Sequence, residues 1–282
     1  MWESSLILHF NGEKFLAENG ELAFLSASLI PSSLVRSETG ERIFLGLNGE
    51  NSYFLWCSAE LLASEESYLS LREIGGELSD LAIGLAVHAQ AVAHWHHKNQ
   101  FCVQCGGKTE PALAGSVRRC IVDGSEHYPR TDPAIIVLLR DENDRILLGR
   151  QGIWPEHRFS TFAGFVEAGE SFEHCVAREV AEEAGVRVCD IEYLGSQPWP
   201  FPSSMMIAFQ ATIRNPESAR PDGEEIVEIR WFDRESILLA IRDNTLLLPP
   251  KISVARAMIE AWFAQGVDGT MNEKLAAQDG WR

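Results

Sequence analysis

Three glutamates set close together restrict the folding of this chain more than any other feature of its sequence. Glu179, Glu182 and Glu183 have the spacing i, i+3 and i+4, so a helix would place all three carboxylates on one face. Ser171 is a suitable N-cap and a glycine follows the segment, which predicts a helix over residues 172–184. Like charges at this spacing repel each other and cost a helix about 0.2–0.5 kcal/mol per pair. The sequence therefore predicts a helix whose acidic face needs a compensating charge.

Two explanations of the acidic face follow from the residues alone. A divalent cation with oxygen ligands would neutralise the carboxylates, and Mg²⁺ held by carboxylates and substrate phosphates is the usual arrangement. The simpler explanation is a solvated acidic face, which needs no ligand. Arg178 and Glu170 stand nearby as groups that could orient the carboxylates. The spacing by itself leaves the two explanations about equal.

The surrounding segment, from Gly164 to Val186, resembles the signature of the Nudix hydrolases. That signature is a glycine, five residues, a glutamate, seven residues, and then Arg-Glu-U-x-Glu-Glu-x-Gly-U with U aliphatic, and the chain matches every specified position. The resemblance implies a loop-helix-loop that binds Mg²⁺ or Mn²⁺ and hydrolyses a nucleoside diphosphate linked to another group. The catalytic residues that it implies are the metal ligands Glu179, Glu182 and Glu183, and the bracing pair Glu170 and Arg178.

A second motif follows the signature. Residues 196–204 alternate prolines with aromatic side chains, a composition that predicts a stiff, extended loop. Such a loop could be a rigid connector, but flat side chains on a stiff backbone also make a good wall for a base or a nicotinamide ring. The prolines fall at every second position, so no Pro-x-x-Pro is present and a ligand for a proline-recognition domain is disfavoured.

The second motif resembles the Ser-Gln-Pro-Trp-Pro-Phe-Pro-x-Ser array of the NADH pyrophosphatase subfamily of Nudix enzymes. The resemblance implies hydrolysis of NAD(H) to NMN(H) and AMP and, in bacteria, removal of NAD caps from RNA 5′ ends. It implies that Glu225 and the carbonyl of Ala163 are further metal ligands. It also implies a homodimer in which Phe165 and a Tyr128 donated by the second subunit sandwich the nicotinamide. The other substrate-binding residues that it implies are Gln197, Pro198, Trp199, Pro200, Phe201, Pro202, Ser203, Ser204 and Ala255.

Other assignments stay open at this stage. Tyr128 and Phe165 could be core residues, and Glu225 could belong to a solvated acidic run. A related activity is hydrolysis of another dinucleotide, such as ADP-ribose or a diadenosine polyphosphate. From a different class, the chain could be a non-catalytic module that senses nucleotides or binds RNA. Loss of a signature glutamate would have supported such a module, and none is lost.

A cysteine group predicts a structural metal site. Cys102, Cys105 and Cys120 have the spacing of the subfamily's four-cysteine zinc ribbon, but Asp123 stands at the fourth position. A carboxylate oxygen can bind Zn²⁺ at about 2.0–2.2 Å, although four cysteines, or three with a histidine, are the common structural sets. His127 is an alternative fourth ligand, and a third possibility is that packing alone holds this segment. We expect zinc here.

The chain of 282 residues is long enough for about two domains. We predict an α+β protein: a Nudix α/β/α sandwich with a zinc-ribbon-like insert and a β-rich N-terminal domain. Ser79 is expected to cap a helix that the polar residues 96–99 end. The predicted divisions are a β-rich domain with a connecting helix over 1–98, the ribbon over 99–130, the Nudix domain over 131–265 and a loose tail over 266–282.

The net charge of −17 argues against a broad cationic face that would hold nucleic acid or an anionic membrane. Residues 101–150 carry 7 acidic and 7 basic side chains, so action on capped RNA should depend more on the 5′ end than on backbone electrostatics. Residues 78–95 form the most apolar long segment, but polar interruptions predict a buried helix and no membrane partner. The few cysteines and the absence of a signal-peptide pattern predict the cytoplasm.

Overall fold

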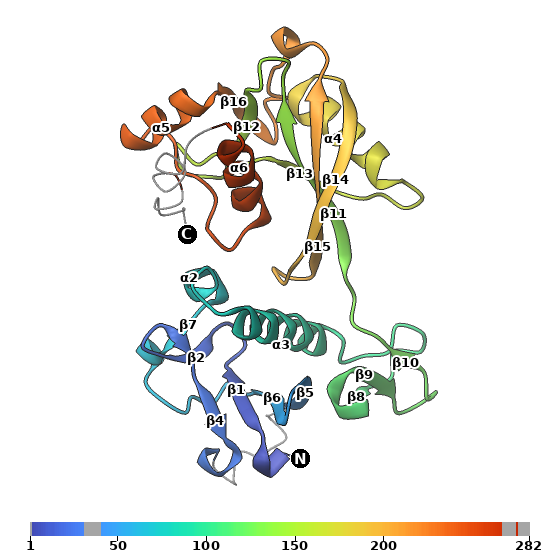
Figure 1. Cartoon of the computed structure of the whole chain (residues 1–282). Helices are drawn as coiled ribbons and strands as arrows, with labels where there is room; N and C mark the ends of the chain where they lie inside the picture. The colour runs from blue at the N-terminus through green and yellow to red at the C-terminus, as the bar shows by residue number, and fades with distance from the viewer. Residues whose placement is uncertain (1, 31–40, 267–274, 276–282) are drawn as a thin grey trace. The chain divides into compact units, whose positions relative to one another are not determined.

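The computed structural model describes residues 2–30, 41–266 and 275. The chain forms two compact units (Figure 1): Met1–Thr131 with Trp199–Ser203, and Asp132–Pro198 with Ser204–Arg282. The predicted tail over 266–282 lies almost wholly outside the described residues. Among those residues, none of the helices is both long enough and apolar enough to cross a membrane.

The N-terminal unit is built on a sheet of seven short strands. Its path is β3-β2-β1-β6-β5, and β4 and β7 pair with β1 and β2. These strands are β1 Leu6–Phe10, β2 Phe15–Glu18, β3 Glu21–Leu22, β4 Phe24–Ser26, β5 Glu41–Asn48, β6 Asn51–Cys57 and β7 Tyr68–Leu69. The helices are α2 Leu71–Ile74 and α3 Asp80–Lys98, and α3 begins at its predicted cap, Ser79. The polar residues 96–98 continue α3 by one turn beyond its expected end.

The cysteine-containing segment forms a small antiparallel sheet within the same unit. Its strands are β8 Thr109–Ala112, β9 Val117–Cys120 and β10 Glu126–His127, in the order β10-β9-β8. Arg118 on β9 is buried, donates to the Thr109 carbonyl oxygen at 2.8 Å and forms an ion pair of 3.1 Å with Glu41. Arg118 therefore joins the small sheet to the β-rich part of the N-terminal unit.

The second unit has a mixed sheet of six strands in the order β14-β15-β11-β12-β16, with β13 paired to β11. Its strands are β11 Asp132–Arg140, β12 Ile146–Gln151, β13 Phe162–Phe165, β14 Val188–Trp199, β15 Ser204–Ile213 and β16 Ile226–Phe232. Its helices are α4 Phe172–Ala184, α5 Arg234–Arg242 and α6 Val254–Ala264. The central strand β11 is antiparallel to β12 and β13 and parallel to β15.

Both faces of this sheet are covered (Figure 1). Along β11, Ile135 and Val137 pack in the same apolar cluster as Val176 and Val180 of α4. The alternating residues Ile136 and Leu138 belong to the opposite cluster, with residues of α5 and α6. This alternation follows from the two-residue period of a strand, and it confirms the predicted α/β/α sandwich.

One expectation about the second motif was wrong. Residues 196–204 were expected to form one loop, but β14 continues to Trp199 and β15 begins at Ser204, so only residues 200–203 connect the strands. β14 is an edge strand and pairs with a neighbour on one side only. A proline whose nitrogen faces the unpaired side removes no hydrogen bond of the sheet. The alternating prolines are therefore compatible with a strand here.

Candidate active site

The glutamate helix has the predicted bounds, 172–184. Ser171 accepts a hydrogen bond from the backbone N–H of His174 at 3.2 Å, and Gly185 has φ of 66°, the left-handed value that ends a helix. The preceding loop approaches the helix closely, because a Cβ on Gly164 would overlap the carboxylate of Glu179. Glycine is therefore required at position 164 if the Glu179 carboxylate is to face the loop.

Arg178 connects this loop to the helix as expected. Its guanidinium donates to both carboxylate oxygens of Glu170 at 2.9 Å and to the Phe165 carbonyl oxygen at 3.0 Å. It also donates to Glu179 at 2.7 Å and to Glu182 at 3.0 Å. The Arg178 guanidinium lowers the pKa of Glu170 to about 2. One arginine thus fixes the carboxylate of Glu170 in the loop and those of Glu179 and Glu182 on the helix.

Glu183 is the least exposed carboxylate of the cluster. Only 4% of the residue is exposed, and its Oε2 has no hydrogen-bond partner among the described residues. Burial, with the charges of Glu225 and Glu179, raises the pKa of Glu183 to about 8. A buried carboxylate without a partner is costly. A hard divalent cation would satisfy it and offset the repulsion within the cluster, so the donor set fits Mg²⁺ or Mn²⁺.

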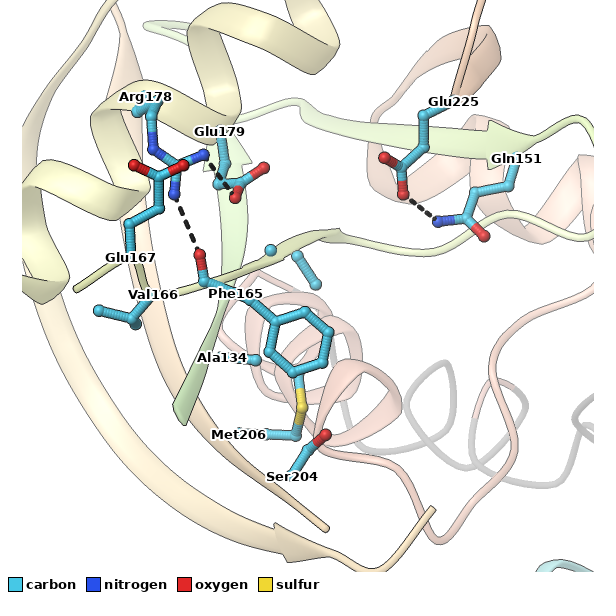
Figure 2. Close-up of a pocket in the computed structure, with 12 residues that line it drawn as sticks. Ala134, Gln151, Phe165, Val166, Glu167, Arg178, Glu179, Ser204, Met206 and Glu225 are labelled. Carbon is cyan, nitrogen blue, oxygen red and sulfur yellow. Dashed lines mark hydrogen bonds and ion pairs between the residues drawn. The ribbon is translucent and has the colours of Figure 1, made fainter. Parts of the chain in front are cut away.

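Glu225 is held by a residue that the sequence did not single out. Gln151 Nε2 donates to Glu225 Oε1 at 2.8 Å (Figure 2), and the next backbone N–H, that of Gly152, donates to the Glu225 carbonyl oxygen at 3.3 Å. The pairing of β12 with β16 shifts register between Arg150 and Gln151. Such a bulge re-aims side chains next to functional sites. Only the strand pairing brings Gln151 and Glu225 together, so sequence spacing gives no sign of it.

A cavity of about 490 Å³ lies beside the cluster (Figure 2). Its lining residues are Ala134, Gln151, Ala163, Gly164, Phe165, Val166, Glu167, Arg178, Glu179, Ser204, Met206 and Glu225. The cavity therefore brings together five of the residues that the resemblance assigned to metal or substrate: Ala163, Phe165, Glu179, Ser204 and Glu225. Phe165 is 60% exposed, so it is not a core residue. Tyr128, in the other unit, is 65% exposed and donates to Glu126 at 3.1 Å, so it is not a core residue either.

Two residues that were expected to bind substrate make contacts near α6 in this structure. The Gln197 amide donates to the Ile252 carbonyl oxygen at 2.8 Å and accepts from the Val254 backbone N–H at 2.7 Å. Ala255 is 2% exposed and packs in the apolar cluster between the sheet and α6. Neither residue lines the cavity. In this structure both residues fix the start of α6.

The aromatic side chains at the end of the second motif belong to the N-terminal unit. The rings of Trp199 and Phe201 lie 4.9 Å apart between centroids. The Arg72 guanidinium lies over both rings, 5.4 Å from Trp199 and 3.9 Å from Phe201. Gln90 donates to the Pro200 carbonyl oxygen at 2.9 Å. These contacts order residues 199–203 within that unit.

The four candidate zinc ligands of the ribbon lie close together. The ligand atoms of Cys102, Cys105, Cys120 and Asp123 all lie within 4.8 Å of one another. Cys105 Sγ and Cys120 Sγ are 3.5 Å apart, and Cys102 Sγ is 3.6 Å from Asp123 Oδ2. Zn–S bonds of about 2.3 Å and a Zn–O bond of about 2.0 Å predict about 3.8 and 3.5 Å for these separations. His127 contacts Ser125 instead, at 3.2 Å.

Two family models match the chain. Residues 130–249 match the family model described as the NUDIX domain, and residues 97–128 match the one described as the NADH pyrophosphatase zinc ribbon domain.

Three relatives share much of the chain. The NAD-capped RNA hydrolase NudC of Mycobacterium bovis is 38% identical over 277 residues, which cover 93% of this chain and 87% of that protein. The mitochondrial NAD(P)H pyrophosphatase NUDT13 of Mus musculus is 37% identical over 70% of this chain and 59% of that protein. The NAD-capped RNA hydrolase NUDT12 of Macaca fascicularis is 35% identical over 66% of this chain and 43% of that protein. The chain therefore belongs to the NADH pyrophosphatase subfamily of the Nudix hydrolases.

Proposed function

We propose that this protein hydrolyses the pyrophosphate of NAD(H) to NMN(H) and AMP with Mg²⁺ or Mn²⁺, and that it removes NAD caps from RNA. The observation that carries the proposal is that Glu183 Oε2 is buried and has no hydrogen-bond partner among the described residues. Its carboxylate cluster lies beside a cavity that is lined by the exposed Phe165. The relatives named for NAD(P)H and for NAD-capped RNA support the same substrates.

In this proposal the carboxylates of the cluster hold the metal, and one of them also acts as the base. Glu179, Glu182, Glu183, Glu225 and the Ala163 carbonyl would hold the metal. When bound, the metal supplies positive charge that neutralises the pyrophosphate and lowers the pKa of an attacking water. One cluster carboxylate would take a proton from the attacking water as the water oxygen bonds to phosphorus, and the bridging P–O bond would break to release the other nucleotide as its phosphate. The hydrogen bonds of Arg178 would keep the carboxylates of Glu179 and Glu182 in place during the reaction.

The remaining parts of the proposal concern the ribbon, the assembly and the compartment. Zn²⁺ would be held by Cys102, Cys105, Cys120 and Asp123, supported by their ligand separations. A homodimer in which Tyr128 reaches the partner's nicotinamide is supported by the exposure of Tyr128 and Phe165. Action in the cytoplasm is supported by the free cysteines of the described residues.

The proposal is tested by product analysis with NADH, Mg²⁺ and Mn²⁺ for the parent chain and for Glu183→Gln. We expect NMNH and AMP from the parent chain. Loss of the charged ligand should lower kcat by about 100-fold or more, because an electrostatic contribution of this kind is worth several kcal/mol. A folded Glu183→Gln chain that hydrolyses NADH at the parental rate would show that the metal-cluster mechanism is wrong. ADP-ribose in the same assay tests the second candidate substrate.

A further inference from the structure

Three exposed arginines of this acidic chain lie near the C-terminal end of α4. Most described arginines form an ion pair with a carboxylate. Arg187, Arg214 and Arg220 are exposed, and none of the three has an ion pair with a carboxylate among the described residues. We call these three residues the arginine cluster.

Backbone hydrogen bonds bring Arg187 beside Arg214 and place Arg220 at the end of α4. The Arg214 N–H donates to the Arg187 carbonyl oxygen at 3.1 Å, which places the start of β14 beside the end of β15. The Arg220 N–H donates to the Ala184 carbonyl oxygen at 3.0 Å, at the last residue of α4. Like charges on facing positions of neighbouring strands are destabilising unless something offsets them. The backbones of the three arginines therefore lie near one another, and the Arg220 guanidinium also donates to the Ser218 carbonyl oxygen at 3.4 Å.

The arginine cluster lies at the end of the metal-binding helix. The side chain of Arg220 packs on Gly185, where an added Cβ would be 3.3 Å from its Cγ. Gly185 is two residues beyond Glu183, and residues 220–225 lead directly from Arg220 to Glu225. Short stretches of chain therefore link the arginine cluster to the carboxylate cluster, from Gly185 back to Glu183 and from Arg220 on to Glu225.

We propose that the arginine cluster binds the phosphodiester backbone of the RNA chain that continues from an NAD cap. The inference rests on the proposed function, because the cap must be cleaved at the carboxylate cluster. Guanidinium groups match phosphate oxygens in a planar, two-point geometry. The net charge of −17 repels RNA elsewhere, so a local cationic site would guide the chain. Backbone electrostatics then matter more for capped RNA than was expected from the equal numbers of acidic and basic side chains in residues 101–150.

A purely structural role is the competing explanation. Positive side chains near a helix C-terminus stabilise the helix dipole by about 0.3–1 kcal/mol each. That role would lower the melting temperature of arginine variants and would affect all substrates equally. Binding of RNA instead predicts an effect on capped RNA alone, which separates the two explanations.

The test compares the parent chain with the triple variant R187Q/R214Q/R220Q, using NADH and a short single-stranded NAD-capped RNA as substrates. Each lost phosphate contact should reduce the slope of log kcat/KM against log salt by about 0.7 for a single strand, so three contacts give about 2. Between about 50 and 200 mM salt, the parental kcat/KM for capped RNA should therefore fall about 16-fold more than that of the variant. The kcat/KM for NADH should be unchanged.

R242Q is the matched control, because Arg242 is an exposed arginine of the same unit that pairs with Asp243 at 2.9 Å. R242Q should leave kcat/KM for NADH and for capped RNA unchanged. Equal losses for NADH and capped RNA in the triple variant, or an unchanged salt slope, would overturn the inference and leave the proposed function standing. A parent chain that cleaves NADH but not capped RNA would also overturn it. A parent chain that cleaves neither substrate would overturn the proposed function itself.

Discussion

The carboxylates of the cluster differ in what holds each of them. Glu179 is held by the Arg178 guanidinium and Glu225 by the Gln151 amide, whereas the Oε2 of Glu183 has no partner among the described residues. Ligands that are held in place before a metal binds lose less freedom on binding. The effect of a substitution near the cluster should therefore depend on which carboxylate loses its hydrogen-bond partner.

Gln151→Leu removes the amide that holds Glu225 while keeping a side chain of similar size. We expect the affinity for Mn²⁺ to fall by about tenfold, as is usual when a group that orients a metal ligand is lost. The measurement is a titration of the substrate-free protein with Mn²⁺, followed by the paramagnetic signal of the free ion.

Gln210→Leu is the control for this prediction. Gln210 also donates to a glutamate, Glu192, at 2.6 Å on the same sheet, but it does not line the cavity. Its loss should leave the affinity for Mn²⁺ unchanged. Equal Mn²⁺ affinities of Gln151→Leu and the parent chain would show that Gln151 has no positioning role.

His9 gives the N-terminal unit a dependence of stability on pH. The residue is fully buried, its Nδ1 lies 2.6 Å from the Tyr68 hydroxyl oxygen, and burial lowers the pKa of His9 to about 4. The unfolded chain protonates this imidazole near pH 6.5, so between about pH 6.5 and 4 only the unfolded state gains the proton. The stabilisation is complete above pH 6.5 and is lost as the pH falls to 4, by about 3 kcal/mol.

Urea unfolding at pH 7 and pH 5 measures this effect. The midpoint of the parent chain should fall more between the two values than that of His9→Gln, because the variant has no imidazole to protonate. His88→Gln, at an exposed position of α3, should retain the parental dependence. A parallel pH dependence of His9→Gln and the parent chain would contradict the assignment to His9.

At the scale of elements, sequence reasoning succeeded where the signals were local. The bounds of α4 followed from Ser171, Gly185 and the glutamate spacing, all within one short segment. The extension of β14 to Trp199 did not follow, because it depends on pairing with β15 at the sheet edge. The contact of Gln197 with the start of α6 did not follow either, because it joins residues 57 positions apart in sequence. Contacts between distant segments explain both differences.

The ribbon provides the prediction at this scale. Its strands have two to four residues and little core, so a bound metal would supply much of its folding free energy. We expect the purified chain to contain stoichiometric zinc by elemental analysis. Asp123→Ala should lose most of the zinc, because it removes one of four ligands, whereas Asp123→Cys should retain it.

Two outcomes of the zinc analysis would contradict this prediction. A parent chain purified without chelator that contains essentially no zinc would show that packing alone holds the ribbon. Zinc retained by Asp123→Ala but lost from His127→Ala would instead assign the fourth ligand to His127.

At the scale of the whole molecule, the net charge of −17 has more than one meaning. Part of it is the carboxylate cluster, whose repulsion a metal would offset. Because most described arginines already have carboxylate partners, the unpaired arginine cluster stands out against an acidic background. A global charge count alone would have hidden that contrast.

The parallel pairing of β11 with β15 joins segments that are far apart in the sequence. Asp132 pairs with Ser204 and Arg140 with Thr212, so the central strand meets this neighbour only after the intervening α4 and β14 exist. Such distant pairings slow folding, because the closure of a long loop precedes the contacts that stabilise it. During synthesis, β11 would leave the ribosome well before β15, with one edge open to association with other chains. Prompt translation of residues 141–213 therefore shortens the interval in which nascent copies of this enzyme could aggregate.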